Sequence, residues 1–169
     1  MIDTLFLLSL MEKASGDSKL KSGFDILNLS LPKDLALNDD EYRAYVEYPE
    51  FGLCIIFTDE SYFAGKASLP IGSGKLFYSG LFFHSEGKDG YSEYKGKLPF
   101  GLLFTDTRQD VVNKLGQQSW QRLARDKQRV ISDRWDDLPD VPYRLHITYN
   151  KDTGRISIIS VNIPDKPLS

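Results

Sequence analysis

The chain has 169 residues, of which 41% are apolar and 27% are charged. This length suits a single domain over residues 1–169, or two small αβ units, 1–90 and 91–169, that share one core. Ten phenylalanines and nine tyrosines supply enough apolar area for such a core, which excludes a disordered chain. Lysine and arginine number 21 against 24 aspartates and glutamates, and the net charge of −3 has the wrong sign for a protein that follows a phosphate backbone. We therefore expect no nucleic-acid partner.

An apolar run at residues 5–11 resembles the central part of a signal peptide. The acidic Asp3 precedes it where a basic residue is typical, and charged residues follow it where a cleavage site would need small ones. The run is also far shorter than the ~20 residues that span a bilayer. We expect instead a helix that is capped by Asp3 or Thr4 and stops at Gly16, in a cytoplasmic protein with no membrane partner.

Alternating apolar and polar residues predict strands, most of them joined by short links. The expected strands span residues 24–29, 42–48, 51–58, 75–84, 129–135, 143–149 and 155–163. Gly80 interrupts one of them and indicates a bulge, and the Asn150–Gly154 link is typical of a hairpin. Short links favour antiparallel pairing, because parallel strands need long crossovers.

A second helix is expected over Arg108–Leu115, capped by Asp106 or Thr107 and ended by Gly116. The same Asp-Thr pair opens the first helix, and strands follow in both cases, which is either a duplication or a coincidence. The sequence thus predicts an α+β fold, with an antiparallel β-sheet of five or more strands and a few short helices packed on one face.

Three residues could carry chemistry, namely Cys54, His84 and His146. Neither histidine belongs to a metal-binding spacing such as HxxxH, HxH or HExxH. A single cysteine cannot form an internal disulfide, and within the apolar run 53–57 a buried thiol behaves as a small apolar side chain. We therefore expect no catalytic residue, no cofactor and no metal, and we do not expect an enzyme.

Charge is distributed unevenly along the chain. Residues 1–89 hold 8 basic and 14 acidic side chains, whereas residues 90–169 hold 13 and 10. Acids between residues 39 and 60 are interleaved with tyrosines, which suits contact with a basic protein partner, because rings supply contact area and acids speed encounter. A solvated hairpin face is the alternative. The candidate partner-binding residues are Asp39, Asp40, Glu41, Tyr42, Tyr45, Glu47, Tyr48, Glu50, Asp59 and Glu60.

A basic run lies in the second half of the chain. Its members are Arg122, Arg125, Lys127, Arg129 and Arg134, and two acidic residues, Asp126 and Asp133, lie among them. We expect a loop or a strand edge there, where charge discourages edge-to-edge pairing with another sheet.

Several turn and core motifs occur between residues 94 and 149. They are Tyr94–Leu102 with its Leu-Pro and Gly-Leu pairs, Thr107–Val111 at a helix start, Leu115-Gly116, Ser132–Trp135 and Leu145–Tyr149. This pattern resembles small immunity proteins found beside toxins in bacterial polymorphic-toxin and secretion loci, and also the helix-then-sheet unit of the β-lactamase-inhibitor-like fold. The resemblance implies an α+β binding protein without catalysis, and it carries over no active-site motif.

The leading hypothesis is an immunity protein, or antitoxin, that binds a cognate bacterial toxin and neutralises it by occlusion. One alternative is an enzyme or a small-ligand module whose pocket is lined by the aromatic residues of 77–83 with His84. Another is a secretion adaptor or chaperone.

Overall fold

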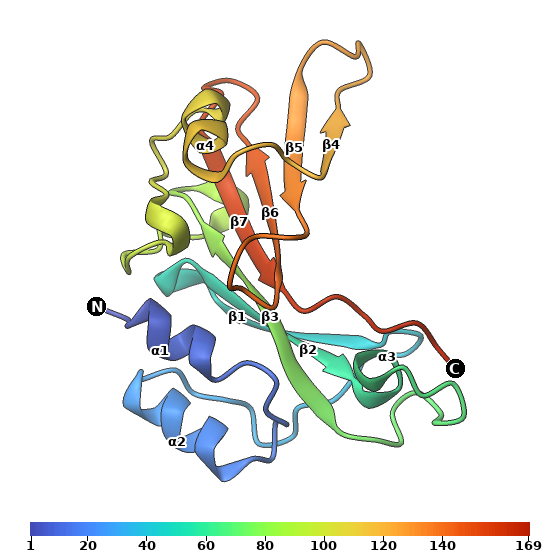
Figure 1. Ribbon diagram of the computed structural model, residues 1–169. Coiled ribbons are helices and arrows are strands. Elements are labelled where there is room, and N and C mark those ends of the chain that lie inside the picture. The colour runs from blue at the N-terminus through green and yellow to red at the C-terminus, as the bar shows by residue number, and fades with distance from the viewer.

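The computed structural model describes all residues, 1–169, and is built around one seven-stranded sheet (Figure 1). Every neighbouring pair of strands is antiparallel, and the strand order is β1-β2-β3-β7-β6-β5-β4. The strands are β1 (Arg43–Tyr48), β2 (Leu53–Asp59), β3 (Leu76–His84), β4 (Trp120–Leu123), β5 (Val130–Trp135), β6 (Arg144–Tyr149) and β7 (Ile156–Asn162). The first half of the chain supplies β1–β3 and the second half β4–β7, and the two sets join where β3 pairs with β7.

Four short helices accompany the sheet: α1 (Thr4–Ser9), α2 (Ser18–Ile26), α3 (Glu60–Ala64) and α4 (Arg108–Leu115). Leu7 of α1, Phe24 of α2 and Val111 of α4 enter the same core, against one face of the sheet. Helix α3 follows β2 directly, and its Phe63 stacks on Phe77 of β3 with ring centroids 4.6 Å apart. The predicted α+β class, with an antiparallel sheet of at least five strands and a few short helices, is confirmed.

The first helix begins as predicted but ends early. The Asp3 side chain accepts a hydrogen bond from the backbone N–H of Phe6 at 3.0 Å and so caps α1. The predicted end at Gly16 is wrong, because α1 ends at Ser9 and the chain then joins the sheet. There the N–H of Glu12 donates to a carbonyl of β3 at 2.8 Å. Pairing with β3 therefore replaces the last helical turns.

The predicted strand at 24–29 is also wrong, because most of it lies in or just after helix α2. The Asp17 side chain accepts from two backbone N–H groups of the first turn and caps this helix. Leu20 and Phe24 lie one helical turn apart, and both are buried. The alternation that predicted a strand begins at Phe24 and so omits Leu20, the residue that reveals the helical period.

The edge strand β4 was not among the predicted strands. All its residues are exposed, so no apolar alternation marks it in the sequence. Its pairing with β5 places Arg122 on the edge strand and Arg125, Lys127 and Arg129 in the hairpin, as expected, whereas Arg134 lies on β5, inside the sheet. The predicted bulge is confirmed, because Gly80 pairs with Ile56 and Tyr78 with Phe57, which leaves Ser79 without a register partner.

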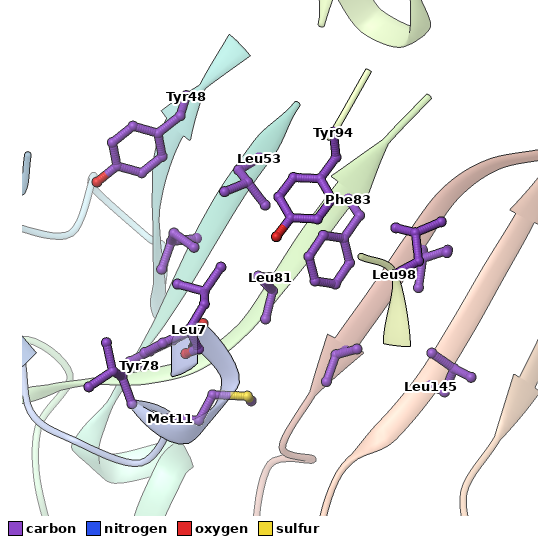
Figure 2. Close-up of a cluster of buried hydrophobic side chains, with 14 of the residues drawn as sticks. Leu7, Met11, Tyr48, Leu53, Tyr78, Leu81, Phe83, Tyr94, Leu98 and Leu145 are labelled. Carbon is purple, nitrogen blue, oxygen red and sulfur yellow. Dashed lines mark hydrogen bonds between the residues drawn. The ribbon is translucent and has the colours of Figure 1, made fainter. Parts of the chain in front are cut away.

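The core lies between the helices and one face of the sheet, which we call the covered face. Figure 2 shows Leu53 of β2, Leu81 of β3 and Leu145 of β6 among its members. Phe24 meets Tyr78 edge-on, with ring centroids 5.8 Å apart. One cluster of 27 buried residues draws on both halves of the chain, so the two sets of strands share it.

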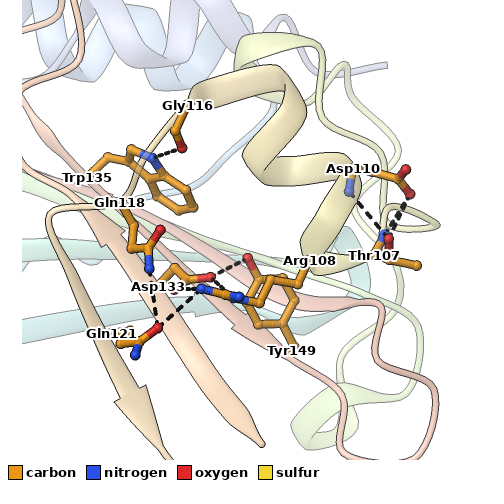
Figure 3. Close-up of polar contacts among 9 residues, drawn as sticks. All are labelled: Thr107, Arg108, Asp110, Gly116, Gln118, Gln121, Asp133, Trp135 and Tyr149. Carbon is orange, nitrogen blue, oxygen red and sulfur yellow. Dashed lines mark hydrogen bonds and ion pairs between the residues drawn. The ribbon is translucent and has the colours of Figure 1, made fainter.

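An ion pair between the buried Asp133 and the partly exposed Arg108 fastens α4 to the covered face (Figure 3). Asp133 of β5 is 0% exposed, and it accepts from Arg108 Nε at 2.8 Å and from the Tyr149 hydroxyl at 3.0 Å. At the start of α4, Thr107 and Asp110 form a reciprocal capping box, so the helix begins as predicted. Every oxygen of the Asp133 carboxylate is hydrogen-bonded within the protein, which makes this network a structural one.

Candidate functional site

Helices α1, α2 and α4 pack on the covered face, and we call the opposite face of the sheet the open face. Part of the open face is covered, because Phe63 of α3 stacks on Phe77 and the Tyr91 ring stacks on His84. Side chains on it alternate with those that enter the core, because successive residues of a strand point to opposite faces. The strand register aligns one residue from each strand in a row across it: Glu47, Cys54, Phe82, Ser160, His146, Arg134 and Trp120. The row runs from a carboxylate on one edge strand to an indole on the other.

A pocket of about 330 Å³ lies at the β1 end of this row, and we call it the open-face pocket. Strands β1, β2, β3 and β7 supply most of its lining, and the loop after β3 supplies the rest. The lining residues are Tyr45, Glu47, Cys54, Phe82, His84, Asp89, Tyr91 and Ile158.

Stacked rings and hydrogen bonds fix the shape of the open-face pocket. The Tyr91 ring stacks on the His84 imidazole, with centroids 3.8 Å apart and planes within 9°. Its hydroxyl donates to Glu47 Oε1 at 2.9 Å and so ties the loop to β1. Phe82 meets the imidazole edge-on at 6.2 Å. The loop is anchored again where the N–H of Tyr94 donates to the carbonyl of His84 at 3.0 Å.

Burial keeps three polar groups of the pocket uncharged near neutral pH. Desolvation lowers the pKa of His84, although a backbone carbonyl and the carboxylates of Asp89 and Glu47 oppose that shift. Desolvation also raises the pKa of the Cys54 thiol to about 12 and raises the pKa of the Tyr91 phenol. A thiol in this state is a poor nucleophile, so the pocket is better suited to binding than to covalent chemistry.

The charged groups of the pocket are carboxylates. Glu47 and Asp89 are both exposed, and both belong to the lining. Beside them, outside the lining, Lys88 Nζ lies 3.8 Å from Asp89 Oδ1. This ion pair is solvent-exposed and long, so it holds the Asp89 carboxylate only weakly.

The other end of the open face is aromatic and basic. Trp120 is 41% exposed, and the Arg134 guanidinium lies over its ring at 5.0 Å from the centroid. His146 faces outward beside them, as the strand alternation predicts, with its ring 6.2 Å from that of Trp120. The β4–β5 hairpin reaches past the rest of the sheet (Figure 1) and adds the exposed side chains of Arg122, Arg125 and Lys127. The open face is therefore acidic at β1 and basic at β4.

The structure divides the predicted partner-binding residues by exposure. Exposed members are Asp39, Asp40, Glu41, Tyr45, Glu47 and Glu50. Tyr42 is half-buried and stacks on Tyr62 at 4.0 Å, and Glu60 is half-buried and pairs with Lys66. Of the whole set, Tyr45 and Glu47 line the open-face pocket. The remaining exposed acids flank β1 in the chain, on the loop before it and the turn after it.

Tyr48 and Asp59 are buried, so their prediction as surface contacts is wrong. Tyr48 alternates into the core, and its hydroxyl donates to the carbonyl of Ser30 at 2.7 Å. Asp59 caps α3 by accepting from the N–H and the hydroxyl of Ser61, and it also accepts from the N–H of Gly72 at 3.0 Å. This carboxylate joins the start of α3 to the loop that contains Gly72.

The alternative hypothesis placed the aromatic residues of 77–83 in a pocket with His84, and Tyr91 was not among its members. Only Phe82 of that stretch lines the open-face pocket. Alternation could have selected it, because Phe82 and His84 lie two residues apart and so share a face of the strand. The return of Tyr91 onto that face depends on the turn at 87–90, and its path is not encoded in a short motif.

A scan against protein-family models found no match to this chain, and searches of curated proteins and of solved structures returned none either. No helix combines the length and the apolar character needed to cross a membrane. No three His, Cys, Asp or Glu side chains are grouped so that they could hold a metal ion.

Proposed function

We propose that this chain is an immunity protein that binds a cognate bacterial toxin in the cytoplasm and neutralises it by occlusion, without catalysis. The observation that carries the proposal is the open face, which ends in an exposed aromatic residue at each edge, Tyr45 on β1 and Trp120 on β4. Rings of this kind provide a large share of the binding energy at protein interfaces, because they bury much area and have few rotatable bonds.

The size of the open face suits a protein partner. Neighbouring strands lie about 4.8 Å apart, so seven strands give a surface roughly 30 Å wide. Strands of about seven residues are roughly 23 Å long, so the face covers roughly 700 Å², close to the ~800 Å² that each partner buries in an ordinary interface. The opposite charges at the two ends would also orient the partner, since misaligned complexes place like charges together.

The resemblance to immunity proteins supports the same function. Its motifs lie in α4, β5 and β6 and in the segment before α4, which together position half of the open face. The acids Asp39, Asp40 and Glu41 border the β1 end, so we place a basic part of the toxin there.

Co-expression tests this function. Each gene product encoded beside this chain is induced in a bacterial host with and without the chain, and growth is measured. We expect one neighbour to arrest growth, the chain to restore it, and the two proteins to elute as one complex. If no neighbour is toxic, or if the chain leaves a toxic neighbour active, the proposal is wrong.

Paired variants connect the rescue to the open face. The double variant Tyr45→Ala/Trp120→Ala should lose rescue while its melting temperature falls by no more than about 4 °C. Leu5→Ala removes another exposed apolar side chain, 78% exposed on α1 away from the open face, and should rescue normally. Equal rescue by both variants would place the interface elsewhere.

A further inference from the structure

We infer that the open-face pocket receives an arginine side chain of the protein partner. This inference rests on the proposed function, since the partner is the toxin. Three features carry it: the pocket has aromatic walls, its lining contains two carboxylates, and its lining contains no lysine or arginine.

The aromatic walls come from Tyr45, Phe82 and Tyr91. A cation within about 6 Å of a ring centroid is attracted to the ring face. A guanidinium is planar and weakly hydrated, so it can stack on a ring and donate hydrogen bonds in its own plane at the same time. The open face already contains this contact at its other end, where Arg134 covers Trp120.

The Glu47 carboxylate is an anion with a free hydrogen-bond acceptor. Its Oε1 accepts from the Tyr91 hydroxyl, and Glu47 forms no ion pair within the chain. Its Oε2 can therefore accept from a guanidinium N–H, a charge-assisted bond of the stronger kind. The hydrogen bond from Tyr91 also holds the carboxylate in position before the partner arrives, which lowers the entropy lost on binding.

Asp89 adds a second negative charge, and Lys88 competes for it at 3.8 Å. An incoming guanidinium must displace this weak internal partner. The other polar groups of the lining, His84 among them, are uncharged and do not repel a cation. At about 330 Å³ the pocket is at the small end of the range for ligand sites, and it fits one side chain better than a larger molecule.

The test uses the isolated chain and two small analogues. N-acetyl-arginine N′-methylamide carries the guanidinium, and the matching citrulline compound has the same shape without the charge. Backbone amide shifts are followed by NMR during titration with each. We expect saturable shifts around the open-face pocket with the arginine compound, at a Kd of about 1–10 mM, and none with the citrulline compound.

Charge variants then assign the binding to named groups. Glu47→Gln and Asp89→Asn should each weaken binding about threefold to tenfold, and Lys88→Gln should strengthen it about twofold. Asparagine suits position 89 because the backbone there has a φ of +54°, which Asn tolerates. Glu50→Gln removes an exposed acid outside the lining and should change nothing.

Two results overturn the inference: the analogues bind alike or not at all, or Glu47→Gln binds the arginine compound as tightly as the wild type with an unchanged melting temperature. Its failure is distinguishable from failure of the proposed function. If growth is rescued but the arginine compound does not bind, the pocket does not receive an arginine side chain, and the proposed function stands. If no neighbouring gene product is toxic, the proposed function is wrong, whatever the titration shows.

Discussion

The two tryptophans of this chain occupy opposite faces of the same sheet. Trp135 is 2% exposed on the covered face, and its indole N–H donates to the carbonyl of Gly116 at 3.1 Å. Trp120 is 41% exposed on the open face, where its contacts are an arginine and a histidine. The difference separates two uses of large apolar side chains: those on the covered face stabilise the fold, and those on the open face are available to a partner.

Replacing each tryptophan by alanine should give the largest difference in stability between the two faces. Trp135→Ala should lower the free energy of unfolding by about 3–5 kcal/mol, because it leaves a core cavity and an unpaired carbonyl. Trp120→Ala should lower it by less than about 1 kcal/mol, since that ring is exposed and loses one cation–π contact. Urea unfolding of both variants measures the two values.

The unfolding slope serves as the control for this pair. Both variants should keep the m-value of the wild type, which shows that the surface exposed on unfolding is unchanged. An equal loss of stability in the two variants would mean that the open face is as important to the fold as the covered face.

Two aspartates near the end of β5 give the next contrast. Asp133 is 0% exposed and pairs with Arg108 on the covered face, whereas Asp136 is partly exposed and pairs with Arg144 at 2.7 Å. Asp133→Asn should cost about 2–3 kcal/mol, because it removes the charge from a buried network and leaves donors poorly matched. Asp136→Asn should cost less, about 1 kcal/mol, because its ion pairs are partly exposed to solvent. Thermal unfolding of both variants compares them, and a larger loss for Asp136→Asn would contradict this ranking.

These contrasts also explain how much of the fold the sequence predicts. Strand β2 is a continuous apolar run that is buried on both sides, whereas β1 and β6 show apolar alternation, because one side of each contacts the core. Strand β4 has none, since neither of its sides is buried, and only its backbone pairing reveals it. Helix α2 was missed because its helical spacing begins before the segment that alternates.

The candidate site was predicted less well than the fold, for a physical reason. The acids and tyrosines of residues 39–60 lie on and around the edge strand β1, but exposure depends on which face each residue takes. Tyr45 and Tyr48 are three positions apart on β1 and so point to opposite faces. Asp59 looks like a surface acid in the sequence, yet it is used as a helix cap, a role that only the fold reveals.

Histidine titration offers a smaller effect on the open face. Burial lowers the pKa of both His84 and His146, and Arg134 adds to the shift at His146. The unfolded imidazoles titrate near 6.5. As the pH falls below that value, the unfolded state binds protons that the folded state does not, so stability is complete above about 6.5 and decreases below it. Unfolding free energies at pH 7.5 and pH 5.5 measure this loss.

Single variants show which histidine is responsible. His84→Gln and His146→Gln should each reduce the difference in unfolding free energy between the two pH values, whatever they do to stability at pH 7.5. An unchanged difference in both variants would assign the pH dependence to other groups.

Reversing charge at the two ends of the open face should affect stability least and association most. Asp39→Lys/Glu41→Lys should change the free energy of unfolding by less than about 0.5 kcal/mol, because both side chains are exposed. Asp40 is left in place because its φ of +62° would strain a lysine.

The same variant should change the association rate. With a basic toxin surface opposite β1, the association rate at low salt should fall about tenfold, and added salt should reduce the difference in rate from the wild type. The matched reversal Arg122→Glu/Arg125→Glu, at the basic end, should leave attraction at the β1 end intact. If both reversals slow association equally, long-range attraction is spread over the whole open face, and the acidic end has no preferred role in recognition.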